Sequence, residues 1–337
     1  MKNFFEKLYQ RNDLTKAEMA QVAGQMFTGH LTDSQISALL IALKIKGVTA
    51  SEMAALAQVI QKEALQIKDA PTCAMDNCGT GGDHLNSFNI STTAAFVLAA
   101  GGITMAKHGN RSISSKSGSA DVLEHLGIAI TPSAENLSYL LQEIGIAFLF
   151  APSMHPNMRY VSKVRQELAT PTILNLIGPL TNPVALESQL MGTFAGDLLV
   201  ETCETLKQLG RKRAVVVHGA YGMDEANLAG VTRYALFDGE KVAEYALTPE
   251  EAGLNNYPIE AIVGGDAARN AAILKAVLKN EPSPYLDTVL LNAGLGFFAN
   301  GKVLDIASGV QMARSIIASG AAYDKLQQLI ACQREVA

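Results

Sequence analysis

The sequence predicts an α/β protein in which a small helical domain, residues 1–70, packs on a larger α/β domain, residues 71–337. Helical periodicity fills the first seventy residues, and an alternation of strands, loops and helices begins after Pro71. No long disordered linker separates the two patterns. The 337 residues are enough for two unequal domains, and 48% apolar against 18% charged residues supplies ample material for buried cores.

The N-terminal part is expected to form three to four helices. Apolar residues within Met19–Phe27 recur every three or four positions, which places them on one face of a helix. Residues that favour helix starts then follow at Thr32 and Thr49, and Gly47 is placed to end the helix between them. These features together predict a small helical bundle.

After Pro71 the elements alternate. We expect strands at Cys73–Asp76 and Ile103–Ala106, each running into a glycine-rich loop, with a helix from Asn89 to Ala100 between them. Short β-branched runs predict two further strands, at Ala214–His218 and Thr288–Asn292. Helices are expected at Leu198–Leu209, Ala267–Leu278 and Val310–Ser319.

Composition excludes several classes of protein. A net charge of −5 argues against a broad nucleic-acid surface, which needs clustered lysine and arginine. No apolar stretch approaches the roughly 18 residues of a membrane span, and Met1–Asp13 lacks the apolar core of a signal peptide. The cysteines show no metal-ligand spacing, which favours free thiols. We therefore expect a cytoplasmic protein that binds neither nucleic acid nor membrane.

Two segments rich in glycine and serine carry the strongest functional signal. Asn77–Asp83 leads toward a helix start at Asn89–Thr93, where free N–H groups favour an anion. Lys107–Ser119 combines three cations with five hydroxyls. Read alone, the first segment is also compatible with an ordinary strand-to-helix turn. It matches neither GxGxxG nor the Walker sequence GxxxxGK[ST]. Together the two segments predict a ligand with more than one phosphate group.

Two further features lie later in the chain. Asp224 and Glu225 follow the predicted strand Ala214–His218, and adjacent carboxylates at the carboxyl end of a strand suit Mg²⁺. An Asp-Glu pair is otherwise often a solvated turn. Arg165 is suited to bind a carboxylate with two N–H groups, although pairing with Glu167 is the plainer interpretation.

In order and approximate spacing, these segments resemble the anthranilate phosphoribosyltransferases over nearly the whole chain. The match includes Gly79–Asp83, Asn89–Thr92, Lys107–Ser119, Arg165, Asn175–Pro183 and Asp224-Glu225, and Gly264–Ala268 and Leu291–Gly294 also resemble C-terminal segments of the family. The resemblance implies a central mixed sheet of the nucleoside phosphorylase type, with a helical insertion near residues 159–183. It implies transfer of a phosphoribosyl group from phosphoribosyl pyrophosphate to the amino group of anthranilate in tryptophan biosynthesis, and a homodimer.

The resemblance also implies roles for individual residues. No single catalytic residue is expected, and Lys107 would assist electrostatically. Mg²⁺ would be held by Ser91, Asp224 and Glu225. Anthranilate would be bound by Gly79, Asn110 and Arg165, in a pocket shaped by His108, His155, Met158 and Pro179. The phosphoribosyl donor would be bound by Gly79, Gly82, Asp83, Ser87, Asn89, Ile90, Ser91, Thr92, Lys107, His108, Gly109, Asn110, Arg111, Ser112, Ile113, Ser114, Ser115 and Ser119.

Two alternatives remain at this point. A pyrimidine nucleoside phosphorylase shares the architecture, but it would not need the Asp224-Glu225 pair. A non-enzymatic paralogue that binds nucleic acid would call for a basic groove, which the acidic charge balance disfavours.

Overall fold

The computed structural model describes residues 1–112 and 116–336. Its centre is a seven-stranded sheet in the order β3-β2-β1-β4-β5-β6-β7. The first five strands of this order are parallel, and β6 and β7 are antiparallel to their neighbours, so the sheet is mixed as expected. The strands are β1 (Ala74–Asp76), β2 (Met105–Gly109), β3 (Ile146–Phe150), β4 (Leu186–Gly192), β5 (Arg213–His218), β6 (Thr232–Phe237) and β7 (Val242–Leu247).

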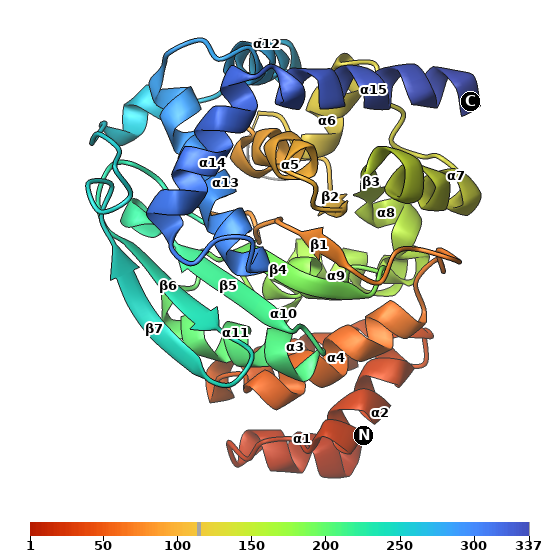
Figure 1. The fold of residues 1–337 in the computed structure, drawn as a ribbon. Helices are drawn as coiled ribbons and strands as arrows, with labels where there is room; N and C mark the ends of the chain where they lie inside the picture. Colours follow the sequence, from red (N-terminus) through yellow and green to blue (C-terminus); the bar gives the residue numbers. More distant parts are fainter. Residues whose placement is uncertain (113–115, 337) are drawn as a thin grey trace.

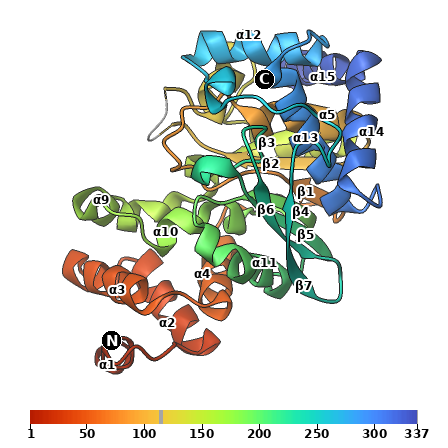
Figure 2. The same cartoon turned by 90° about the vertical axis from the view of Figure 1, so that its left-hand side faces the viewer.

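Helices cover both faces of the sheet (Figure 1, Figure 2). The N-terminal bundle consists of α1 (Lys2–Tyr9), α2 (Lys16–Phe27), α3 (Asp33–Lys46) and α4 (Ala50–Lys62). It packs with α9 (Arg159–Leu168), α10 (Ile173–Leu176) and α11 (Leu199–Gln208). The other helices are α5 (Ile90–Ala100), α6 (Ser119–His125), α7 (Ala134–Tyr139), α8 (Ala151–Met154), α12 (Ala267–Leu278), α13 (Pro284–Asn300), α14 (Ile306–Ala318) and α15 (Ala321–Val336).

Three of the bundle helices begin after a threonine, and two of these threonines, Thr32 and Thr49, are the starts that the sequence predicts. Thr15, Thr32 and Thr49 each accept the N–H three residues on, and Glu18, Gln35 and Glu52 reach back to close a reciprocal cap. Such caps stabilise a helix start by about 1 kcal/mol each. The bundle is therefore defined by local sequence as well as by its apolar core.

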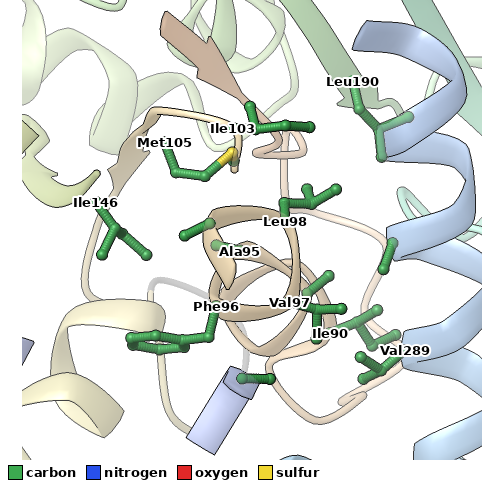
Figure 3. Close-up of a cluster of buried hydrophobic side chains, with 14 of the residues drawn as sticks. Ile90, Ala95, Phe96, Val97, Leu98, Ile103, Met105, Ile146, Leu190 and Val289 are labelled. Atoms are coloured by element: carbon green, nitrogen blue, oxygen red, sulfur yellow. The ribbon is translucent and has the colours of Figure 1, made fainter. Parts of the chain in front are cut away.

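Alternation along β5 creates two cores, one on each face of the sheet. Ala214 and Val216 point to the core shared with the N-terminal bundle, whereas Val215 and Val217 point to the core around α5 and α13. Helix α5 lies at the centre of that second core. Figure 3 shows its side chains between Met105, Ile146 and Leu190 of the sheet and Val289 of α13.

The structure corrects three expectations. Thr288–Asn292 is not a strand but part of α13, whose side chains are buried almost all round and so show no helical stripe. The helix expected at Val310 begins at Ile306, where Asp305 caps it by accepting the Ser308 N–H. The strand expected at Ile103–Ala106 is β2 and extends to Gly109, so Lys107 and His108 lie on the sheet and not in a loop.

Among the described residues, none of the helices combines the length and the apolar character that crossing a membrane requires.

Candidate active site

The predicted site segments leave the carboxyl ends of neighbouring parallel strands. The order β2-β1-β4-β5 places the loops after Asp76, Gly109, Gly192 and His218 at the same edge of the sheet. From β1 the chain crosses to β2 on one side, and from β4 it crosses to β5 on the other side. The two connections therefore leave a crevice at the carboxyl ends of β1 and β4, which is where α/β sheets bind ligands. This topology brings Asp224 and Glu225 to the first glycine-rich loop.

Two glycines allow the Asp224 loop to approach the sheet. Gly79 and Gly192 pair as an isolated parallel bridge, which extends the contact between β1 and β4. A Cβ at Gly192 would lie 1.5 Å from the Asp224 carbonyl oxygen, and one at Gly79 would lie 2.3 Å from Asp224 Oδ2. The Gly81 N–H donates to the same Oδ2 at 2.6 Å. Glycine is therefore required at both positions by close approach.

Three carboxyl groups converge there. Burial raises the pKa of Asp224 well above its usual range, and the charges of Glu225 and Asp83 raise it further. Burial likewise raises the pKa of Glu225, partly offset by Lys107 and by hydrogen bonds from Ser91. Asp83 Oδ2 is buried and has no hydrogen-bond partner within the described residues. Buried carboxyls that disfavour one another in this way suit a divalent cation, which supplies the missing positive charge.

Positive charge and free donors face this acidic group. Helix α5 begins at Ile90, and the backbone N–H and hydroxyl of Ser91 in its first turn lower the pKa of Glu225. Lys107 Nζ lies 3.4 Å from Ser91 Oγ, on a side chain buried within β2. The helix start, its hydroxyl and the ammonium group are thus assembled beside the carboxyls, as a metal–phosphate ligand would need.

The described residues on either side of positions 113–115 contact one another. Ser119 Oγ donates to the Asn110 carbonyl oxygen at 3.1 Å, and the Gly118 N–H donates to Asp121. Arg111 forms ion pairs with Asp121 and Glu124 at 2.7 and 2.6 Å. In this conformation Arg111 is therefore engaged by α6, unlike Lys107. The expected donor ligands Ile113, Ser114 and Ser115 lie outside the described residues.

Two of the residues expected around anthranilate, His108 on β2 and His155 after α8, are in contact. His108 and His155 lie edge to face with ring centroids 5.2 Å apart, and burial lowers the pKa of each, to about 4 and about 3. Both rings are therefore neutral near pH 7. A gap of about 10 Å³ borders His155 and Met158, but its other lining residues are Phe27, Ile60, Glu63 and Asn157, so it is not the pocket expected for anthranilate.

Arg165 is half-buried on α9, and burial lowers the pKa of its guanidinium. Glu167, the partner that the plainer interpretation gave it, lies 3.9 Å from Lys163 instead. No described residue accepts a hydrogen bond from Arg165. A guanidinium held in this way is available for a carboxylate.

Asp76 was missed by the sequence analysis although it connects the site segments. Its fully buried carboxylate accepts from the N–H groups of Asn77 and His108, at 2.7 and 3.2 Å. It also accepts from Cys78 Sγ at 3.2 Å and Asn182 Nδ2 at 3.0 Å. Four donors fill both oxygens, so the Asp76-Cys78-His108 cluster, whose spacing resembles a metal site, is explained as a hydrogen-bonded junction. A short buried strand ending in aspartate was the signal that could have indicated it.

Comparison with known proteins first defines the class. Residues 2–64 match the helical bundle domain of a glycosyl transferase family, and residues 72–323 match the a/b domain of such a family. These two matches account for both cores and for the loops of the crevice.

The relatives then define the family. An anthranilate phosphoribosyltransferase of Listeria monocytogenes is 60% identical over 336 residues, covering 100% of this chain and 99% of the relative. One of Streptococcus mutans is 56% identical over 329 residues, covering 98% of each. The enzyme of Thermus thermophilus has a TM-score of 0.93 at 40% identity, covering 98% of this chain and 99% of that one. The Saccharomyces cerevisiae enzyme in complex with PRPP and Mg has a TM-score of 0.89 at 25% identity, covering 99% and 97%. This chain belongs to the anthranilate phosphoribosyltransferase family.

Proposed function

We propose that the chain transfers the 5-phosphoribosyl group of phosphoribosyl pyrophosphate to the amino group of anthranilate, in L-tryptophan biosynthesis. The products are N-(5-phosphoribosyl)anthranilate and pyrophosphate. The observation that carries this proposal is the convergence of Asp83, Asp224 and Glu225 on the start of α5 and on Lys107. That arrangement suits a magnesium diphosphate, and the yeast relative was solved in complex with PRPP and Mg.

In this proposal Ser91, Asp224 and Glu225 hold Mg²⁺, and the predicted donor loops bind the phosphoribosyl group. The metal, when bound, supplies positive charge opposite the departing diphosphate. Lys107 adds a fixed positive charge on the same side, where cleavage of the C1–oxygen bond places negative charge. The amine of anthranilate is already neutral at pH 7, so no strong general base is required. The remaining contribution of the chain is to position the two substrates.

The direct test follows anthranilate fluorescence after addition of phosphoribosyl pyrophosphate, with and without Mg²⁺. We expect metal-dependent loss of the signal and release of pyrophosphate in equal amount. A folded protein that leaves anthranilate unchanged but cleaves pyrimidine nucleosides with phosphate would instead be a nucleoside phosphorylase.

Arg165→Ala is expected to raise the KM for anthranilate by about tenfold to a hundredfold, because a hydrogen-bonded pair with a carboxylate is lost. The KM for phosphoribosyl pyrophosphate should change little, since the predicted donor ligands lie on other segments. Steady-state kinetics with each substrate varied in turn measures both constants. Lys163→Ala, on the same helix, serves as the matched control. An unchanged anthranilate KM would remove Arg165 from the site.

A homodimer formed through the helical bundle, working in the cytoplasm, completes the proposal. Tyr9 and Ile45 are 60% and 63% exposed on α1 and α3, two helices in contact. Large apolar side chains exposed on two neighbouring helices are consistent with an interface there. Among the described residues all cysteines are free thiols, as a reducing compartment maintains them. Light scattering should give twice the chain mass, and Ile45→Glu should lower it toward that of the single chain.

A further inference from the structure

The segment Ile262–Asn270 lies against Asn86–Asn89, the residues that lead from the first glycine-rich loop into α5, although the proposed function assigns this segment no role. The Phe88 N–H donates to the Ile262 carbonyl oxygen at 3.2 Å, and the Gly264 N–H donates to that of Asn86 at 2.9 Å. A Cβ at Gly264 would lie 2.9 Å from Phe88 Cα. Residues Asn86–Phe88 are therefore paired with a segment about 175 residues further on in the chain.

Helix α12 starts at the end of this segment and places one buried amide beside the loop. Asp266 caps the helix by accepting the Arg269 N–H at 2.9 Å. Asn270, in the first turn, is 2% exposed. Its Oδ1 accepts the Gly265 N–H at 2.8 Å, and its Nδ2 donates to Asn89 Oδ1 at 2.9 Å.

The polarity of this chain of hydrogen bonds is fixed by the backbone. The Gly265 N–H only donates, so the oxygen of the Asn270 amide must face it and the NH₂ must face Asn89. Asn89 therefore turns its own oxygen to Asn270. Asn89 stands at the start of α5, but its side chain makes no capping hydrogen bond. Within the described residues its NH₂ group has no hydrogen-bond partner.

We infer that Asn270 is a positioning residue that fixes Asn89 with its NH₂ group toward the phosphates of the donor. This inference rests on the proposed function. An NH₂ group donates to phosphate oxygens, whereas the amide oxygen in the same place would repel them. A cavity of about 110 Å³ lies at this pair of segments, lined by Ser87, Lys116, Gly264 and Asn270 among others. The cavity is thus lined by polar groups, one of which, Lys116, is cationic.

Asn270→Asp tests the polarity with almost no change in shape. The new carboxylate accepts from Gly265 as before but offers no donor to Asn89, so Asn89 must turn its NH₂ group to the carboxylate oxygens. The amide oxygen of Asn89 then faces the phosphates. We expect the KM for phosphoribosyl pyrophosphate to rise about tenfold to a hundredfold, as for loss of a hydrogen bond to a charged group. The KM for anthranilate should stay within about twofold of wild type, because Asn270 and Asn89 are not among the residues expected to bind anthranilate.

A double-variant cycle separates positioning from a general effect on folding. In an Asn89→Ala background, Asn270→Asp should raise the KM for phosphoribosyl pyrophosphate no further, because its route of action is gone. Asn300→Asp is the matched control, since Asn300 also donates to a side-chain oxygen, Ser188 Oγ at 2.9 Å, elsewhere in the fold. Asn270→Ala leaves the amide of Asn89 free to turn either way, so the KM for phosphoribosyl pyrophosphate should rise less than in Asn270→Asp. This variant replaces Asn270→Asp in the test if the aspartate variant does not fold.

Two results would overturn the inference. One is an unchanged KM for phosphoribosyl pyrophosphate in folded Asn270→Asp, and the other is the same rise with and without the Asn89 side chain. Both results are judged by comparison with wild-type enzyme that is active in the same assay. Inactive wild type would contradict the proposed function instead.

Discussion

Replacing Asp224 with Asn and Glu225 with Gln together is expected to lower turnover by about two to three orders of magnitude and to remove the response to Mg²⁺. Amide groups keep the shape of the carboxyls but carry no negative charge, so the cation loses its anionic ligands. Lys107 and the start of α5 remain to bind the diphosphate. Affinity for the donor should therefore fall less than turnover does. The measurement is turnover against Mg²⁺ concentration at saturating substrates.

The same variant should fold, and this separates loss of metal from loss of structure. Burial and mutual repulsion disfavour the charges of Asp224 and Glu225, as the raised pKa values of both groups indicate. Without Mg²⁺ the variant should melt at a temperature no lower than wild type. Glu240→Gln with Glu281→Gln, two exposed positions, also replaces two acidic residues by amides and should leave turnover unchanged. Wild-type turnover and metal response in the Asp224/Glu225 variant would contradict the metal assignment.

Much of the site could be predicted because its polar residues follow short strands in sequence. Asn77–Asp83 and Asp224-Glu225 each come after a strand, and parallel strands present their carboxyl ends at one edge. The residues that follow each strand in the sequence therefore indicated which polar groups the fold brings together. The roles of these residues as ligands remain proposals, which the variants above address.

The residues that support those groups could not be predicted, because their importance lies in pairing across the fold. Asp76 matters through Asn182, and Asn270 through Asn89, and neither pair is close in sequence. Gly192 matters because a distant backbone oxygen occupies the place of its side chain. The same holds for α13, whose burial by neighbouring helices removed the periodicity that distinguishes a helix from a strand.

Gly192→Ala is expected to disable the enzyme although position 192 carries no functional group. The new Cβ would lie 1.5 Å from the carbonyl oxygen of Asp224, so the loop that carries Asp224 and Glu225 must move away from β4. A displacement of about 1 Å at a catalytic group costs about a hundredfold in rate, and overpacking costs about 1–3 kcal/mol or more in the free energy of unfolding. Thermal unfolding and turnover at saturating Mg²⁺ measure the two effects.

Gly24→Ala provides the matched control for this change. Gly24 lies inside α2, and a Cβ there meets nothing within 4 Å, so alanine should stabilise the helix by up to about 1 kcal/mol and leave turnover unchanged. If Gly192→Ala were as active and as stable as wild type, the contact between β4 and the Asp224 loop would not hold the carboxylates in place. If its stability fell while turnover per folded molecule did not, Gly192 would serve the fold alone. Loss of both is the result expected when one backbone contact positions the metal ligands.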